Sequence, residues 1–252
     1  MRVATFNILH GRSPEDDQVH MDRLASAVQA LDADVLALQE VDRNQPRSRN
    51  ADLTLVAAEA MGAREHRFVA ALSGSPGSTW FAATGEEQPA DAAYGIALLS
   101  RYPLTAWQVV RLPAIRTAVP MRFGHRLMPT WVRDEPRVAV AADVAAPGGA
   151  LTVATTHLSF VPRWNRHQLR LLVRALAGRR RPLLLTGDLN MDAEAARSVT
   201  GLRSLADHAT FPSPRPLEQL DHVLADGALA AEASEALRLP VSDHRALYVD
   251  LA

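Results

Sequence analysis

Several apolar segments of this sequence end in side chains that can coordinate a cation, transfer a proton or donate to a phosphate oxygen. Taken alone, each has a plain structural explanation, such as a turn, a helix cap or a buried histidine. Six such segment ends in one chain favour a shared ligand site, because strand ends in layered α/β proteins line a common crevice. They carry Asn7, Glu40, His157, Asp188 with Asn190, Asp221 with His222, and Asp243 with His244.

Three of these residues have the chemistry of a hard-cation site. Mg²⁺ prefers carboxylate and amide oxygens together with water, and it commonly uses only one or two protein carboxylates. Glu40, Asn7 and Asp243 suit that role. We therefore expect them to hold Mg²⁺ or Mn²⁺.

The remaining residues can handle protons and phosphate oxygens. His157 and His244 can donate hydrogen bonds to phosphate, and a carboxylate such as Asp221 can adjust the pKa of a neighbouring histidine. Asp188 can take a proton from water, while Asn190 holds the water or a phosphate oxygen. The combined set predicts metal-assisted hydrolysis of a phosphate ester.

Composition narrows the alternatives. The 252 residues are 48% apolar and 22% charged with a net charge of −1, which is typical of a globular protein. The absence of cysteine excludes disulfides, thiolate zinc sites and cysteine nucleophiles. All 27 basic residues are arginine, which excludes a Schiff-base or Walker A lysine. The near-neutral charge argues against tight sequence-independent DNA binding.

The elements that position these residues alternate between short apolar strands and amphipathic helices. The chain shows no repeat and no linker between separate cores, so residues 1–252 are expected to form a single domain with mixed sheets. Helices are predicted at 20–31, 51–61, 165–177 and 192–200. Strands are predicted at 2–7, 34–39, 67–72, 79–83, 94–99, 104–111, 137–144, 150–156, 183–187, 219–224 and 245–250.

Two segments, 73–93 and 112–136, have no clear pattern of regular structure. Long loops of this kind are commonly functional or disordered. The second places apolar side chains beside several cations, and we expect it to be an ordered loop on the substrate side. The cations are Arg116, Arg122, His125, Arg126 and Arg133.

The ordered motifs resemble those of the endonuclease/exonuclease/phosphatase superfamily, which includes DNase I. They occur in the family order and run from residue 5 to residue 244, so the resemblance covers nearly the whole chain. The motifs are Thr5-Phe6-Asn7, Leu38-Gln39-Glu40-Val41, Tyr94-Gly95-Ile96-Ala97-Leu98-Leu99-Ser100-Arg101, Thr156-His157-Leu158, Gly187-Asp188-Leu189-Asn190, Leu220-Asp221-His222-Val223 and Ser242-Asp243-His244.

This resemblance implies a four-layer αββα sandwich, in which two mixed β-sheets pack face to face and helices cover the outside. It implies a Mg²⁺ or Mn²⁺ ion on Glu40 with help from Asn7 and Asp243. It also implies that Asp188 and Asn190 orient or activate the attacking water. His157 and His244 would then bind the scissile phosphate, with Asp221 orienting His244. Arg43, Tyr94 and Arg137 are candidate substrate contacts, and a structural role is an equal alternative for Tyr94 and Arg137.

The branch within the family is less constrained than the chemistry. The chain carries His157-Leu158-Ser159 where repair nucleases have a Pro-Asn-containing loop, and it lacks the Pro-Ala-Trp-containing stretch of inositol 5-phosphatases. The favoured function is a phosphodiesterase or phosphatase acting on a small or lipid-linked phosphate ester. A DNA or RNA endonuclease is the alternative within the same chemistry, and a catalytically inactive binding scaffold is the alternative outside it.

The sequence also gives expectations for the location, the oligomeric state and the partners of the protein. No run of eighteen apolar residues could span a membrane, and a strand pattern begins at Met1 with no signal peptide before it. A cytoplasmic location and a monomer are therefore the expectations, with a phosphate ester as the partner. Nucleic acid is a possible partner that the charge does not favour.

Overall fold

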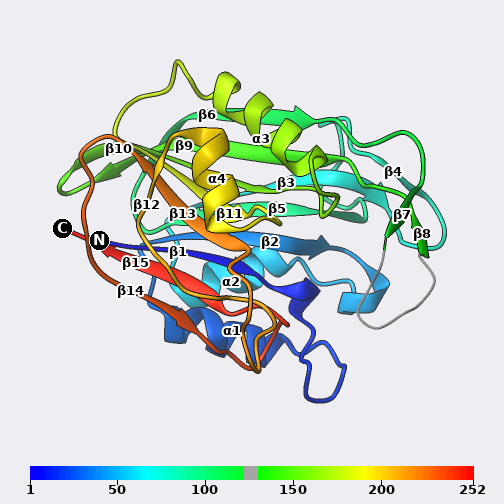
Figure 1. Ribbon diagram of the computed structural model, residues 1–252. Helices are drawn as coiled ribbons and strands as arrows, with labels where there is room; N and C mark the ends of the chain where they lie inside the picture. The colour runs from blue at the N-terminus through cyan, green and yellow to red at the C-terminus, as the bar shows by residue number, and fades with distance from the viewer. Residues whose placement is uncertain (122–129) are drawn as a thin grey trace.

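The computed structural model describes residues 1–121 and 130–252, and its core is two β-sheets packed face to face (Figure 1). The larger sheet has the order β14-β15-β1-β2-β5-β3-β4, and the smaller has the order β12-β13-β11-β10-β9-β6. Their strands are β1 Arg2–Asn7, β2 Val35–Arg43, β3 Glu65–Gly74, β4 Trp80–Ala82, β5 Ala93–Ser100, β6 Leu104–Leu112, β9 Arg137–Ala146, β10 Gly149–His157, β11 Leu183–Asp188, β12 Arg203–Ser204, β13 Asp221–Asp226, β14 Ala231–Leu237 and β15 Ala246–Leu251.

Helices cover both outer faces and complete four layers. The helices α1 Met21–Leu31 and α2 Leu53–Met61 pack on the larger sheet. On the other side, α3 Trp164–Ala175 and α4 Ala193–Thr200 pack on the smaller sheet. Two short 3₁₀ helices, Leu9–Gly11 and Pro46–Ser48, follow β1 and β2. The predicted αββα sandwich is therefore confirmed.

Successive side chains of a strand point to opposite faces of its sheet, and a strand between two layers packs against apolar side chains on both faces. In β2, Val35 and Ala37 belong to the core between the sheets, whereas Leu36 and Leu38 pack beneath α1 and α2. A strand buried on both faces is commonly apolar on both, which is why residues 35–38 form a continuous apolar run.

Strand register brings the predicted polar ends together. The parallel pair β10 and β11 places His157 beside Asp188, and the antiparallel pair β11 and β13 places Asp188 beside Asp221. In the other sheet, parallel pairing of β1 with β2 aligns Asn7 with Gln39, next to Glu40. Asn7, His157, Asp188 and Asp221 lie at strand ends, as predicted. Glu40 was expected to close its strand but lies inside β2, which continues to Arg43.

Gly187 allows β10 and β11 to pair closely just before Asp188. It has a φ of +129°, and a Cβ atom there would lie 2.0 Å from the Thr156 carbonyl oxygen. We expect Gly187→Ala to lower the free energy of unfolding by about 3 kcal/mol or more, through the clash and the strained backbone. Urea unfolding measures this loss. Gly178→Ala is the control, because no atom lies within 4 Å of its Cβ position, and equal stability of the two variants would contradict the close-approach argument.

Segment 112–136, which has no clear sequence pattern and was expected to be an ordered loop, contains two short strands. Val119–Met121 (β7) and Thr130–Val132 (β8) form a two-stranded antiparallel sheet. The segment is anchored at its ends, because Asp134 accepts hydrogen bonds from the backbone of Ile115 and from the Ser159 hydroxyl. Arg122, His125 and Arg126 lie outside the described residues, so their predicted role is not addressed by the structure.

Four strands were not predicted, namely β7 and β8 of the two-stranded sheet, β12 and β14. β14, Ala231–Leu237, pairs antiparallel with β15 at the sheet edge, and the two-residue β12 pairs with β13. The sequence of β14 is rich in alanine and glutamate, which have low strand propensity, so its partner rather than its composition makes it a strand. The other strands and the four α-helices occur near their predicted positions.

Candidate active site

The Asp188 carboxylate is at the centre of the polar cluster. Its Oδ2 atom accepts a hydrogen bond from Asn7 Nδ2 at 3.0 Å and lies 3.5 Å from His157 Nε2 and 3.8 Å from His244 Nε2. Its Oδ1 atom accepts the backbone N–H of Asn190 at 3.0 Å. Asp188 is buried, so one carboxylate connects residues from both sheets at the end of β11.

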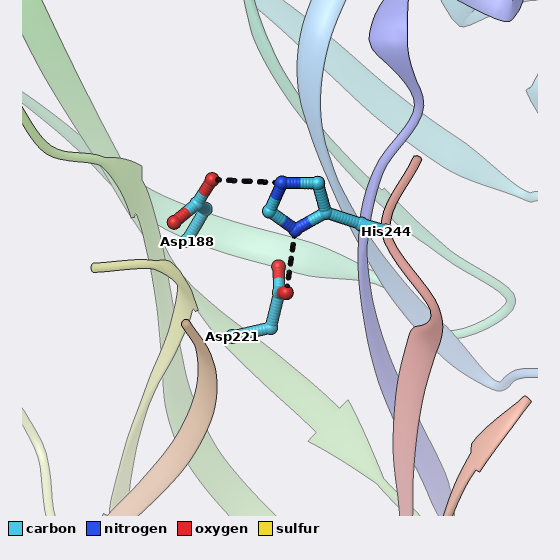
Figure 2. A group of neighbouring side chains, drawn as sticks. All are labelled: Asp188, Asp221 and His244. Atoms are coloured by element: carbon cyan, nitrogen blue, oxygen red, sulfur yellow. Dashed lines mark hydrogen bonds and ion pairs between the residues drawn. The ribbon is translucent and has the colours of Figure 1, made fainter. Parts of the chain in front are cut away.

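A second carboxylate fixes the orientation of His244. Asp221 lies 2.8 Å from His244 Nδ1, which leaves Nε2 facing Asp188 (Figure 2). Asp221 is fully buried, and its other oxygen, Oδ1, has no hydrogen-bond partner among the described residues. The aromatic ring of Phe211 packs 5.0 Å from the imidazole. His244 is therefore held by a carboxylate on one ring nitrogen and by an aromatic ring on one face.

The turn before His244 is tied to the first strand. The Ser242 hydroxyl donates to the Asn7 carbonyl oxygen at 2.6 Å and accepts the backbone N–H of His244 at 3.0 Å. Ser242 has a φ of +73°, a left-handed conformation that is uncommon for serine. The two hydrogen bonds offset that strain and set His244 relative to Asn7.

A β-bulge aims Glu40 into the cluster. The pairing of β2 with β5 shifts register between Leu38 and Val41, and Glu40 has a φ of +57°. Bulges redirect side chains in this way near functional sites. Glu40 Oε1 accepts a hydrogen bond from Asn7 Nδ2 at 3.2 Å, so the Asn7 amide lies between Glu40 and Asp188.

Gln39, the other residue of the bulge, ties the two sheets together behind the cluster. Its buried amide donates to the Thr5 hydroxyl at 3.0 Å and to the Thr155 hydroxyl of the opposite sheet at 3.1 Å. The sequence reasoning did not assign Gln39 a role. Its only signal was a glutamine inside an otherwise apolar run.

The two histidines have opposite tendencies to carry charge. Burial, helped by the positive charges of Arg137 and His244, holds the pKa of His157 well below its ordinary value. Burial also lowers the pKa of His244, but the carboxylates of Asp221 and Asp188 outweigh it and raise that pKa to about 10. At neutral pH, His157 is therefore neutral and His244 is charged.

The carboxyl groups of Glu40 and Asp188 resist ionisation. Burial raises the pKa of Glu40, and the charge of Asp243 raises it further. Burial raises the pKa of Asp188 to about 7, against the opposing effect of His244. If all groups were ionised, the four carboxylates of Glu40, Asp188, Asp221 and Asp243 would outnumber the cations His244 and Arg137, and neighbouring carboxylates are among the causes of the raised pKa values of Glu40 and Asp188. A divalent cation would offset that excess.

The donor atoms present suit such an ion. Asp188, Asp221 and His244 each offer a ligand atom, and these atoms lie within 4.8 Å of one another. The predicted oxygen ligands Asn7 and Glu40 are linked to Asp188, because the Asn7 amide donates to both carboxylates. The carboxylate and amide oxygens of Glu40, Asp188 and Asn7 fit a hard divalent cation.

The predicted substrate contacts occupy different places. Arg137 is buried, and its positive charge acts on both Glu40 and His157. Tyr94 is also buried, with Trp80 against its ring, and this burial, together with the charge of Glu40, raises its pKa. Arg43 instead donates to the backbone of Gln88, away from the cluster.

The family model described as the Endonuclease/Exonuclease/phosphatase family matches residues 4–244. The chain belongs to this family. Members of the endonuclease/exonuclease/phosphatase family hydrolyse phosphate esters, so the chain is a hydrolase acting on phosphate ester bonds. No curated protein matched the sequence.

Solved structures of the endonuclease/exonuclease/phosphatase fold cover the whole chain. A family protein from Beutenbergia cavernae DSM 12333 has a TM-score of 0.70 and 23% identity, and 71% of its own chain is covered. A mannosyl-6-phosphatase from Bacteroides thetaiotaomicron VPI-5482 has a TM-score of 0.67 and 16% identity, with 99% covered. D. rerio TDP2 complexed with single-strand DNA product has a TM-score of 0.63 and 12% identity, with 98% covered. These likenesses establish the fold of the chain.

None of the helices among residues 1–121 and 130–252 combines the length and the apolar character needed to cross a membrane.

Proposed function

We propose that the chain is a Mg²⁺-dependent phosphoesterase that hydrolyses a phosphodiester or phosphomonoester by attack of water. The observation that carries this proposal is the Asp188 carboxylate, which lies within 4 Å of polar nitrogens of Asn7, His157 and His244. One proton acceptor is thus surrounded by groups that can hold a phosphate.

The charges of the side chains support distinct roles. With a pKa of about 7, Asp188 can take a proton from the attacking water, since a general base works best when its pKa is near the operating pH. Asn190, whose side-chain nitrogen donates to the Leu158 carbonyl oxygen at 3.0 Å, would position that water or a phosphate oxygen. Charged His244, oriented by Asp221, would donate to a phosphate oxygen, and neutral His157 would do the same through its N–H.

Glu40 and Asp243, with Asn7, are the proposed ligands of the metal. When bound there, Mg²⁺ would supply Lewis-acid polarisation of a phosphoryl oxygen. Asp221 is less suited to the ion, because one of its oxygens is already used in holding His244. Arg137 and Tyr94 are proposed to border the substrate next to Glu40.

The proposed substrate is a small or lipid-linked phosphate ester. The net charge of −1 supports this class over a long polyanion, whose binding normally rests on many cations. The similar structure of a mannosyl-6-phosphatase is compatible with a small ester, although at 16% identity it supports the fold more than the substrate.

Metal removal tests this function. We expect EDTA to abolish ester hydrolysis by the purified protein and Mg²⁺ or Mn²⁺ to restore it, because the excess carboxylates would repel an anionic substrate without the ion. Hydrolysis is followed as inorganic phosphate from a monoester and as the released alcohol from a diester. The assay uses a panel of sugar phosphates, lipid phosphodiesters and supercoiled plasmid. Heat-denatured protein serves as the control for contaminating phosphatase.

The panel also separates the alternatives. Metal-dependent nicking of the plasmid, without release from the small esters, would replace the proposed substrate class with nucleic acid. If the protein hydrolysed none of these substrates at any metal concentration, the proposal would be overturned.

A further inference from the structure

A pocket lined by three arginines lies at the open edge of the sandwich, where β3 of the larger sheet contacts β6 of the smaller one. Its volume is about 410 Å³. The arginines are Arg43 from β2, Arg67 from β3 and Arg111 from β6. The pocket lining includes none of the residues that surround Asp188. Positive charge from three strands thus gathers at a place separate from the candidate active site.

Uncharged neighbours hold Arg43. One of its terminal nitrogens, Nη2, donates to the Gln88 carbonyl oxygen at 2.9 Å, and its guanidinium lies 4.8 Å from the centre of the Phe68 ring. Its Nε atom is buried and has no hydrogen-bond partner among the described residues. Arg43 is therefore preorganised, and one donor is unused.

The other two arginines are held in a similar way. The guanidinium of Arg67 lies 5.3 Å from the centre of the Trp107 ring, and Arg111 Nη1 donates to the Ala70 carbonyl oxygen at 3.3 Å. Within residues 1–121 and 130–252, neither these two nor Arg43 forms an ion pair within 4.0 Å. Three cations in one pocket would repel each other, so an anion between them would be stabilised.

The one acidic residue of the pocket is engaged elsewhere. The carboxylate of Glu87 accepts the backbone N–H groups of Thr84 at 2.5 Å and Gly85 at 3.0 Å. Those backbone donors hold the Glu87 carboxylate within its own loop. The carboxylate therefore forms no ion pair with the three arginines of the pocket. The pocket keeps a formal excess of two positive charges.

Gly85 provides room for one of these arginines. Its φ is +99°, and a Cβ atom at this position would lie 2.9 Å from Arg111 Nη2. Any other residue would strain the loop backbone and push the guanidinium away. The loop that contains Gly85 therefore packs directly against Arg111, and both residues form part of the pocket wall.

We propose that this pocket binds an oxyanion, namely a phosphate group. Planar guanidinium groups bind phosphate through paired hydrogen bonds, and they remain charged at all physiological pH values. A neighbouring cavity of about 320 Å³ is lined by both Arg111 and Arg137, so the pocket adjoins the region of the candidate active site. The phosphate is either free or part of a larger ligand that reaches between the two places.

Titration of inorganic phosphate into the full chain in EDTA tests the pocket by calorimetry. Without metal, the carboxylates around Asp188 disfavour an anion, so binding reports the arginines. We expect saturable binding to one site, and Arg67→Gln and Arg111→Gln should each weaken it about tenfold. Arg174→Gln, which removes the same charge from an exposed position on α3, is the matched control and should leave the affinity unchanged.

The outcomes separate cleanly. Absence of binding by the wild type, or equal affinity in the wild type and both pocket variants, overturns the proposal. Thermal unfolding of each variant checks that the fold is retained, and Gly85→Ala gives a second route, because it should weaken binding while all three arginines remain.

A sugar bisphosphate and the matching monophosphate distinguish the two sources of the phosphate. Both are titrated into Mg²⁺-loaded Asp188→Asn protein, in which turnover is blocked. If Arg67→Gln weakens only the bisphosphate, the group belongs to a larger ligand. If the variant weakens inorganic phosphate alone, the pocket holds the free ion. This proposal does not depend on the proposed hydrolysis, because its primary measurement is binding without metal.

Discussion

Asp188→Asn should abolish turnover while leaving the protein at least as stable as the wild type. Asparagine has the same shape and can keep its contact with the Asn190 backbone, but it cannot accept a proton. Loss of a general base commonly lowers kcat by about 10² to 10⁴-fold. The measurement is metal-dependent phosphate release, and turnover at the wild-type rate would contradict the proposed role.

The stability half of this prediction follows from the pKa of Asp188. Burial raises that pKa from 3.8 to about 7, so the folded protein binds the proton more tightly than the unfolded chain does. Wild-type stability therefore falls as the pH rises from about 4 through 7. Asparagine imitates the protonated form and removes that loss. We expect urea unfolding at pH 8 in EDTA to show an equal or larger free energy for Asp188→Asn, and the difference should shrink towards pH 4.

His244→Ala should lose both activity and stability. The substitution removes the side chain that is proposed to donate a hydrogen bond to the phosphate. It also leaves Asp221 as a buried, uncompensated charge whose Oδ1 atom has no hydrogen-bond partner among the described residues. Breaking a buried ion pair from one side costs about 3–5 kcal/mol. Urea unfolding at pH 6 measures the loss of stability, and phosphate release measures the loss of activity.

A double-mutant cycle separates these two effects. Adding Asp221→Asn to His244→Ala removes the stranded charge, so we expect much of the stability to return while activity does not. In the wild type, the contribution of the His244–Asp221 pair to the free energy of unfolding also depends on pH. Because the pKa of His244 is raised from 6.5 to about 10, its contribution is complete below pH 6.5 and is lost as the pH rises towards 10. Full recovery of activity in the double variant would exclude His244 from the chemistry.

The sequence was enough to predict the strand ends that carry the cluster, because each is a local feature. An apolar run fixes the strand, and the polar residue that follows it, such as Asp188 after β11, must lie at the strand end. Register then places His157 and Asp221 beside it. The alternation of buried strands and amphipathic helices also favoured mixed sheets, whereas the four-layer sandwich was implied by the resemblance to the family.

Other parts of the site depend on distant partners and leave little trace in the sequence. Phe211 has no local motif that places it against His244, and the bulge that aims Glu40 arises from pairing between β2 and β5. Arg43 was expected to contact substrate phosphate because of its spacing from Glu40. That role remains a prediction, and the structure gives the side chain other neighbours, Phe68 and Gln88.

The Gln39 amide, which bonds to Thr5 of one sheet and Thr155 of the other, has a consequence for how this protein can change over generations. Asn7 and Glu40 come from one sheet, while His157 and Asp188 come from the other, so neither sheet carries the chemistry by itself. A shift of one sheet relative to the other would move Asn7 and Glu40 away from His157 and Asp188. We therefore expect changes in the interior that aligns the sheets to be constrained together with the proposed site residues, more than changes in the peripheral loops.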